Sequence, residues 1–318
     1  MIPKLPLLNS SNFTLSKFIT MKKIILLSFI FCSIYLGYAQ EKIIGSKEKA
    51  TVTRELASFT AVYCDMIADL QIIQSPESKV MITASENIIE YVNSKISAGR
   101  LSLTLKDSLN YSNCGCNIKI YTPHLNDINL KSNCTTTSIS GFTEEDLSIK
   151  LCGDLNLSDI TITNNLAITT IGKIKIKDFS AKNITMDIKG ISKNYISKQK
   201  KSSLIENLSI NIRGAVSLNM LDLNADKIFI NSETYRDVQL AGRANELTLR
   251  NRGREPFNAK DLKTRIAYID NTGYGEVKLT VTDTAIVSPT TEDLGDGLTI
   301  GWNDKIKIYG GGRVIKKN

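Results

Sequence analysis

Histidine, tryptophan and proline are scarce in this sequence, with one, one and six copies among 318 residues. The single histidine, His124, follows Pro123 at an expected turn with no serine or cysteine motif beside it, so we interpret it as a surface turn residue rather than a general base. His124 is the only histidine available as a zinc ligand, and Cys114-Gly115-Cys116 lacks the two-residue gap of a zinc motif. We therefore predict no metal site. We also predict no cofactor, because the sequence has no P-loop, dinucleotide fingerprint or nucleophile elbow.

A strong charge of one sign is also missing from the expected mature chain. Residues 1–39 hold four lysines and no acidic residue, so the mature chain has 40 − 4 = 36 basic and 32 acidic residues, a net charge of +4. This charge is too weak and too evenly spread to indicate a nucleic-acid partner. The overall composition, 42% hydrophobic and 23% charged, is that of a globular protein with enough apolar residues for a core.

The N-terminal residues have the pattern of an export signal. Met21 is followed by two lysines, an uncharged apolar run over residues 24–36, and Gly37-Tyr38-Ala39. A positive segment, an apolar segment and a small-residue cleavage site together define a secretory signal peptide. We predict cleavage after Ala39, with Gln40 as the new N-terminus, and we expect residues 1–20 to be an upstream extension.

Two other interpretations of this N-terminal segment are weaker. A transmembrane anchor would need roughly 20 apolar residues, whereas residues 24–39 number 39 − 24 + 1 = 16. A lipoprotein at Cys32 is disfavoured because the bulky Phe31 precedes it, where such sites usually have a small residue. We therefore expect an exported protein, periplasmic or on the cell surface, with no membrane span after signal removal.

A short pattern repeats through residues 147–281: a glycine followed by aliphatic residues at the second and fourth positions. It occurs as GDLNL at 153–157, GKIKI at 172–176, GAVSL at 214–218 and GEVKL at 275–279. The steps are 172 − 153 = 19, 214 − 172 = 42 and 275 − 214 = 61, close to one, two and three units of about twenty residues. A fixed period with alternation inside each unit predicts a solenoid of stacked short strands.

This unit has a simple physical interpretation. Leu155 and Leu157 face one side of the strand, while Asp154 and Asn156 face the other. No rung can bury its own apolar face, so neighbouring rungs must stack. Glycine at the head of each strand suits a corner, where a positive φ or a close approach of backbones is needed. The alternative is an antiparallel β-sandwich, whose strands also recur at short intervals.

The sequence divides into four parts on this interpretation. After the signal peptide of residues 1–39, residues 40–57 form a polar lead-in, 58–123 an N-terminal β-rich part, and 124–318 a parallel β-helix-like solenoid. Alternating stretches such as DLQIIQ at 69–74 and RLSLTL at 100–105 predict strands in the N-terminal part. The predicted fold class is therefore all-β.

The order of motifs along the chain resembles the head GIN domain family of auto-transporter adhesins from Bacteroidetes-type bacteria. The motifs are DLQIIQ at 69–74, VMITASEN at 80–87, GRLSL at 99–103, YTP at 121–123 and IYGGGRV at 308–314. The resemblance covers residues 59–316 and implies an exported, all-β, β-helix-like protein without established catalytic residues. The chain departs from the family at 151–153 and 170–172, where LCG and TIG replace serine-glycine pairs, and at Arg313, where proline is expected.

Cysteines at rung spacing suggest a disulfide. Cys134 lies 134 − 116 = 18 residues after Cys116, and Cys152 lies 152 − 134 = 18 residues after Cys134. Residues one rung apart lie about 4.8 Å from each other, within the Cα range of a disulfide, and export favours oxidation. Cys134–Cys152 is the preferred pair. The alternative is a column of reduced, buried thiols that act as small hydrophobic residues.

A polar, basic segment follows Gly190. Residues 193–203 contain Lys193, Lys198, Lys200 and Lys201, and the step from Gly190 to Gly214 is 214 − 190 = 24, longer than its neighbours. We interpret the segment as a loop that bulges from one rung. It is either a contact for an acidic glycan or a solvated loop that blocks edge pairing.

Two aspartates are the best carboxylate pair for catalysis. Asp159 and Asp178 each lie six residues after a glycine, so they are expected in adjacent rungs, where two carboxylates can act as an acid–base pair. Both also precede a new segment of the chain, where aspartate commonly makes a turn. The turn interpretation is preferred, so no catalytic residue is assigned.

The sequence therefore favours an exported, non-catalytic β-solenoid that acts as an adhesin or scaffold and binds a glycan or a cell-envelope protein. The alternative is a polysaccharide lyase or hydrolase of the parallel β-helix class. Oligomeric state and ligand identity do not follow from the sequence.

Overall fold

The computed structural model describes residues 42–106, 110–131, 136–199, 203–288, 290–293, 298–301 and 305–316. The predicted signal peptide and its cleavage site, Ala39 and Gln40, lie outside these residues and stay predictions. The chain divides into two units. The first joins residues 1–43 with 107–112, and in its described part β1 (Lys42–Ile44) pairs with β8 (Asn110–Ser112) in a two-stranded sheet.

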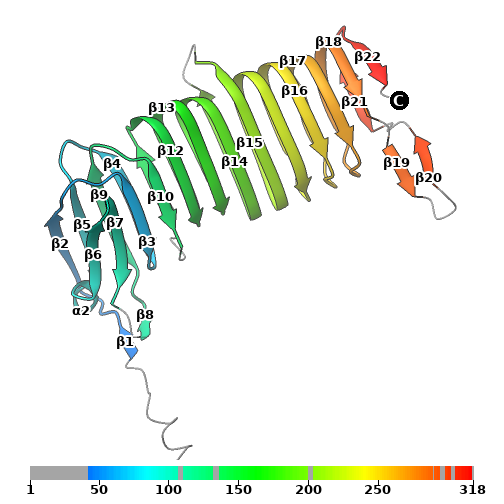
Figure 1. The fold of residues 1–318 in the computed structure, drawn as a ribbon. Coiled ribbons are helices and arrows are strands. Elements are labelled where there is room, and N and C mark those ends of the chain that lie inside the picture. The colour runs from blue at the N-terminus through cyan, green and yellow to red at the C-terminus, as the bar shows by residue number, and fades with distance from the viewer. Residues whose placement is uncertain are drawn as a thin grey trace, which may run out of the picture. The chain divides into compact units, whose positions relative to one another are not determined.

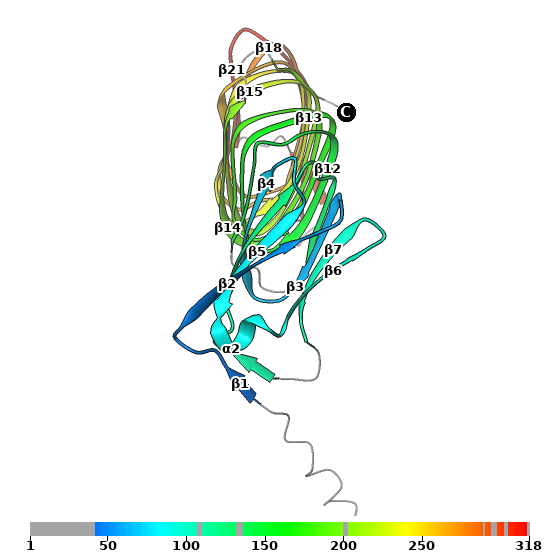
Figure 2. The same cartoon turned by 90° about the vertical axis from the view of Figure 1, so that its left-hand side faces the viewer.

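The second unit, residues 44–106 and 113–318, is a β-solenoid of about eight turns. Figure 1 shows its strands stacked one after another, and Figure 2, a view along the stack, shows the rungs superimposed as flattened rings. Every pairing between successive rungs from β10 to β18 is parallel. The predicted all-β solenoid is thus confirmed, and the antiparallel sandwich is excluded.

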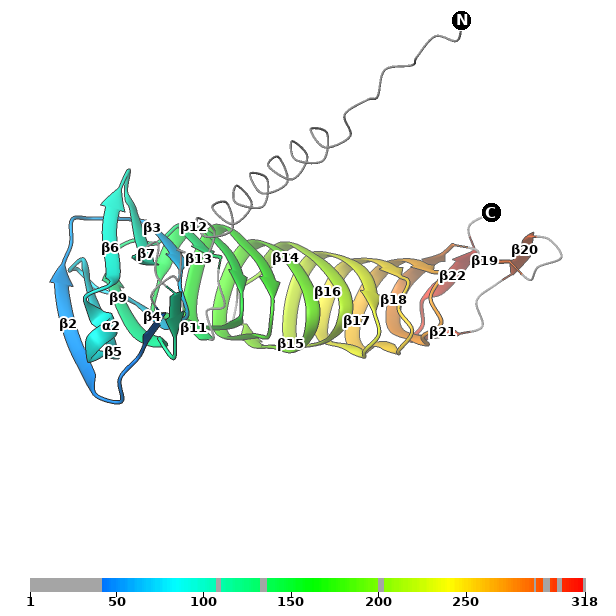
Figure 3. The same cartoon turned by 90° about the horizontal axis from the view of Figure 1, so that it is seen from below.

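The strands of the rungs lengthen from β10 to β15 and are shorter again from β16 to β22, and the longest of them continue around the corners of a rung. The strands of this part are β10 (Asp127–Leu130), β11 (Thr136–Ser140), β12 (Thr143–Cys152), β13 (Asp154–Ile171), β14 (Ile174–Gln199), β15 (Ile205–Thr234), β16 (Val238–Asn251), β17 (Phe257–Asn271), β18 (Val277–Val287), β21 (Ile306–Tyr309) and β22 (Arg313–Lys316). A separate antiparallel hairpin, β19 (Thr290–Asp293) with β20 (Leu298–Gly301), is visible beside the last rung in Figure 3.

The residues before 124 continue the same stack and close its N-terminal end. The elements are β2 (Lys49–Glu55), β3 (Ala61–Asp65), β4 (Ala68–Gln74), β5 (Lys79–Ser85), the short helix α2 (Glu86–Ile89), β6 (Val92–Ser97), β7 (Arg100–Leu105) and β9 (Cys116–Thr122). β3 and β4 pair in parallel with β10 and β11 on one side and with β7 and β9 on the other. β5, β2 and β6 then add antiparallel strands, which terminate the parallel stack.

Alternating aliphatic residues fill the interior, as the repeat predicts. Leu155 pairs with Ile174 and Leu157 with Ile176, a step of 174 − 155 = 19 residues, and all four are at most 2% exposed. Val216, Leu218, Val277 and Leu279 are equally buried. Each such side chain contributes roughly 1.5–3 kcal/mol when it leaves water. The rungs are therefore stabilised by their neighbours rather than individually.

Part of the interior is polar and internally hydrogen-bonded. Asn251 and Asn271 are paired residues of successive rungs, and the Nδ2 of Asn251 donates to the Oδ1 of Asn271 at 2.9 Å. Asn194, 2% exposed, accepts a hydrogen bond at its Oδ1 from the backbone N–H of Ile174 at 2.7 Å. Its Nδ2 donates to Ser192 and to the Ser217 carbonyl. Buried amides are tolerated at these positions because their polar atoms have partners.

Glycine occupies one corner of the solenoid for the reasons expected. Gly214 has φ +96°, and an added Cβ would lie 2.6 Å from the carbonyl oxygen of Gly190 in the adjacent rung. At Gly172 an added Cβ would overlap the Gly153 carbonyl oxygen. Any larger residue would force the rungs apart at this corner.

One local expectation is wrong, and the polar lead-in contains a strand. Within residues 40–57, residues 49–55 form β2, which pairs with β5. Residues 193–199 do not bulge as a loop but belong to β14, since Ser192, Asn194 and Ile196 alternate inward and continue the ladder to β15. Of the predicted loop, residues 200–202 lie outside the described residues.

A pair of neighbouring substitutions tests the register. Ile174 is buried and Lys175 is exposed, so Ile174→Asp places an unpaired charge in the interior and should cost roughly 3–5 kcal/mol of unfolding free energy. Lys175→Asp should change stability by less than about 0.5 kcal/mol. Chemical denaturation of both variants measures the difference, and equal losses would show that the register is wrong.

Candidate functional site

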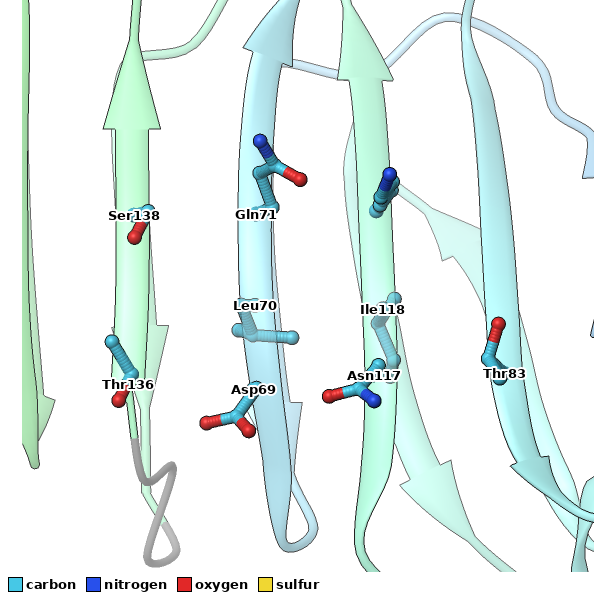
Figure 4. A pocket seen from close by; sticks show the side chains of 9 residues that line it. Asp69, Leu70, Gln71, Thr83, Asn117, Ile118, Thr136 and Ser138 are labelled. Carbon is cyan, nitrogen blue, oxygen red and sulfur yellow. The ribbon is translucent and has the colours of Figure 1, made fainter. Parts of the chain in front are cut away.

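A groove with a volume of about 610 Å³ lies on the outer face of four adjacent strands. Figure 4 shows the strands side by side, with their outward polar residues toward the viewer. Thr83 comes from β5, Asn117 and Lys119 from β9, Asp69 and Gln71 from β4, and Thr136 and Ser138 from β11. Leu70 and Ile118 lie between them and are buried, so the groove has an apolar floor and polar walls.

Strand register aligns the groove residues in two rows that run across the strands. Asp69 pairs with Asn117 and Gln71 with Lys119. On the other side of β4, Gln71 pairs with Ser138. Paired residues point to the same side of a sheet about 4.8 Å apart, so each row offers hydrogen-bonding groups at regular short intervals.

The same rows continue beyond the groove onto the solenoid. Ser138 pairs with Asn156 of β13, and Asn156 pairs with Lys175 of β14. Further along, Tyr195 pairs with Asn219. From there the row passes through three amide side chains and ends in two lysines. The successive partners are Asn219, Gln239, Asn258, Lys278 and Lys307. We call this side of the solenoid, from Thr83 to Lys307, the polar face.

Four lysines gather at the middle of the polar face, and we call them the lysine cluster: Lys173, Lys175, Lys177 and Lys193, all exposed. The first three lie two residues apart: Lys173 immediately precedes β14, and Lys175 and Lys177 lie at its start, with Ile174 and Ile176 buried between them. The hydrogen bond from Ile174 N–H to Asn194 Oδ1 places Lys193 and Tyr195, which flank Asn194, on the adjacent rung.

The lysine cluster differs in charge balance from the C-terminal end of the polar face. There, Glu276 lies 2.7 Å from the Nζ of Lys278 and also contacts Lys307, and these hydrogen bonds lower the pKa of its carboxyl. Within the described part of the chain, by contrast, no ion pair involves Lys173, Lys175, Lys177 or Lys193. The positive charge of the polar face is therefore concentrated at β14.

The predicted ligand-contact lysines are thus only partly brought together. Lys193 joins the lysine cluster, whereas Lys200 and Lys201, and the side chain of Lys198, lie outside the part that is described. Sequence reasoning missed Lys173, Lys175 and Lys177 as site residues because it grouped lysines along the chain, whereas the solenoid groups them across rungs. The signal was present in the repeat, since the residues between Ile174 and Ile176 must face outward.

The two candidate catalytic aspartates form corners instead of a cleft. Asp159 and Asp178 are exposed and have φ values of +53° and +51°. Asp222 repeats the conformation at φ +58°. Aspartate tolerates this left-handed backbone better than most residues, because its short side chain can hydrogen-bond locally. The turn interpretation is confirmed.

His124 is exposed outside the strands, as expected, and its Nδ1 lies 3.4 Å from Glu144 Oε1. That carboxylate oxygen also accepts a hydrogen bond from the backbone N–H of Leu125 at 3.1 Å. Glu144 therefore fixes the turn before β10. Among the residues described, no group of three or more His, Cys, Asp or Glu side chains is arranged to hold a metal ion.

The described cysteines are buried or partly buried. Cys152 ends β12 and is partly buried, while Cys134 lies outside the described residues, so the Cys134–Cys152 disulfide stays a prediction. Cys64, Cys114 and Cys116 are buried. Burial, with a smaller effect of Cys114, raises the pKa of the Cys116 thiol to about 11, so this thiol is protonated and unreactive at neutral pH.

Thiol counting tests both statements. In protein secreted into an oxidising compartment, we expect fewer than five free thiols in the mature chain after unfolding, and restoration of two on reduction. Cys152→Ser should leave Cys134 free and abolish that gain. In the folded protein Cys116 should react with iodoacetamide far more slowly than after denaturation. Five free thiols in the unreduced protein would exclude the disulfide and favour the alternative, a column of reduced thiols that act as small hydrophobic residues.

Comparison with solved structures finds chains of low sequence identity that cover most of this one. A "putative adhesin" from Bacteroides fragilis NCTC 9343 is 14% identical, and the match covers 86% of this chain and 100% of that chain with a TM-score of 0.42. A "putative lipid binding protein" from Parabacteroides distasonis ATCC 8503 is 15% identical, with 87% of this chain and 95% of that chain covered and a TM-score of 0.39. A "putative adhesin" from Parabacteroides merdae ATCC 43184 is also 15% identical, with 87% of this chain and 100% of that chain covered and a TM-score of 0.36. No curated protein matches.

A family model described as "Putative auto-transporter adhesin, head GIN domain" matches residues 58–158 and 200–290, which is more than half of the 318 residues. The match confirms the resemblance read from the order of motifs. This chain belongs to the head GIN domain family of auto-transporter adhesins.

Proposed function

We propose that this chain is a non-catalytic adhesion module that binds a glycan or a protein partner along its polar face. The observation that carries the proposal is two runs of paired outward polar residues, from Gln71 through Ser138 and Asn156 to Lys175, and from Tyr195 to Lys307. A ligand with regularly repeated groups can meet an equivalent row of partners on every rung. Membership of an adhesin family supports the same function.

The chemistry of the polar face suits many weak contacts rather than one deep pocket. Asn156, Asn219, Gln239 and Asn258 are half-buried, so their side chains are partly ordered by the rungs while their edges stay accessible. Amides both donate and accept hydrogen bonds, as sugar hydroxyls and peptide groups require. Binding along such a face gains affinity from the number of simultaneous contacts.

Hydrolase or lyase activity is the rival function, and the carboxylates of the polar face are where it would arise. Asp69 lies in the groove, and Asp154 follows two strands away, beyond Thr136. Glycosidic cleavage needs one carboxyl group that donates a proton and another that acts as base or nucleophile. Asp154 Oδ1 instead accepts the backbone N–H of Lys173 at 3.0 Å, which fixes it as part of the rung. We therefore propose binding without turnover.

We also propose that the protein acts outside the cytoplasm, in the periplasm or at the cell surface. The adhesin family and the N-terminal sequence pattern support export. Among the described residues, no helix is both long and apolar enough to cross a membrane. The partner is then a glycan or a protein of the cell envelope or of a contacted surface.

Blocking the polar face tests the proposal. Asn156 lies between the groove and the lysine cluster, so Asn156→Trp should reduce binding to the glycans found in an array screen by roughly tenfold or more, because a bulky ring interrupts the row. Asn211→Trp is the matched control: it is also a half-buried asparagine, but it lies on the opposite side of the solenoid, where it pairs with Asp187. This variant should bind normally.

Two outcomes would contradict the proposed function. Equal binding by Asn156→Trp and Asn211→Trp would show that the polar face is not the binding surface. Turnover of a bound polysaccharide by the purified protein, lost in Asp69→Asn, would show that the module is an enzyme. Thermal melts of each variant establish that the rungs stay folded.

A further inference from the structure

The lysine cluster lies in a part of the chain that the family model does not match. The matched segments are residues 58–158 and 200–290, and all four lysines fall between them. The lysine cluster is therefore a feature of the polar face that the family match does not cover.

In the part of the chain that the structure describes, the lysines of the cluster form no ion pair, and they are regularly spaced. Lys175 and Lys177 alternate with buried residues along β14, so their side chains emerge about 6.6 Å apart on one side, and Lys173 directly precedes the strand. Lys193 adds a further charge on the adjacent rung. Asp154, on the neighbouring rung, accepts a hydrogen bond from the backbone N–H of Lys173 at its Oδ1. A flat array of like charges attracts a ligand that carries repeated negative charges.

The surroundings of the lysine cluster distinguish between classes of polyanion. Asn156 and Ser158 pair with Lys175 and Lys177 on one side, and Tyr195, 47% exposed, lies on the other. Hydroxyl and amide groups beside the charges match the hydroxyl groups of sugars. A single exposed tyrosine can pack on one sugar ring, whereas single-stranded nucleic acid is bound by series of aromatic side chains that stack successive bases.

We propose that the lysine cluster binds an acidic polysaccharide, with carboxylate groups of successive sugars paired to Lys173, Lys175, Lys177 and Lys193 and sugar hydroxyls bonded to Asn156 and Ser158. The chain of sugars runs along the polar face toward the groove. This inference rests on the proposed function and deepens it by naming the class of ligand. No bond is made or broken, so the interaction is reversible and electrostatic in part.

Polygalacturonate binding to the mature protein tests the inference, with the methyl-esterified polymer as the uncharged counterpart. We expect binding of the charged polymer that weakens steadily from low to high salt, because exposed charges are screened within about 10 Å at 0.1 M ionic strength. The methyl-esterified polymer should bind at least roughly tenfold more weakly.

Charge-changing variants locate the site. The triple variant Lys173→Gln, Lys175→Gln and Lys177→Gln should lose roughly tenfold or more of the affinity for polygalacturonate and most of its salt dependence. Replacement of the same three residues by arginine should retain binding. The matched control changes the same net charge elsewhere, through Lys150→Gln, Lys227→Gln and Lys263→Gln, which are exposed residues outside the polar face. The control should bind like the unaltered protein.

The outcomes separate this inference from the proposed function. If the glutamine triple variant and the control triple variant bind polygalacturonate equally, or if polyglutamate or duplex DNA binds more tightly than polygalacturonate, the acidic-polysaccharide inference is overturned. The adhesion function still stands in that case if Asn156→Trp abolishes binding of another glycan or protein. If neither the glutamine triple variant nor Asn156→Trp changes the binding of any ligand, the acidic-polysaccharide inference and the proposed adhesion function are both wrong.

Discussion

The backbone ladder between successive rungs is the interaction on which the rest of this structure depends. A rung such as residues 154–171 has one apolar side, which it can bury only when another rung pairs with it in parallel and in register. Because the side-chain period of a strand is two, a shift of one residue would expose every buried aliphatic. Burial therefore fixes the register, and the register in turn fixes which side chains share a row on the surface.

Corners and buried amides maintain this register where aliphatic residues cannot. Glycine allows rungs to approach at Gly172 and Gly214, and left-handed aspartates turn the chain at Asp159 and Asp178. The hydrogen bond between Asn251 and Asn271 links two rungs through their interior. These devices occur at equivalent places in different rungs, so they repeat the same turn without interrupting the ladder. The structural result is a face on which outward residues of successive rungs are paired from Tyr195 to Lys307.

Much of the fold follows from the sequence, whereas the site follows only in part. The spacing of Gly153, Gly172 and Gly214 and the alternation around them predict the rungs, because burial imposes that pattern on each unit. The spatial neighbours of a lysine do not follow so directly. Lys193 is close in sequence to Lys198 but lies in space beside the rung of Lys173. Asn194 faces the interior and continues β14, a position that its polar side chain does not predict. Polar residues that are buried with partners look the same in a sequence as loop residues.

The central claim is that one row of the polar face is continuous and regularly spaced, and distances between spin labels test it most directly. Tyr195, Asn219, Gln239, Asn258, Lys278 and Lys307 are successive partners. Pulsed electron paramagnetic resonance on pairs that share Lys307 should give about 24 Å from Tyr195 and about 19 Å from Asn219, a decrease of about 4.8 Å per rung. Distances that do not decrease in equal steps, or that exceed these values by more than the length of the labels, would contradict the stacked register.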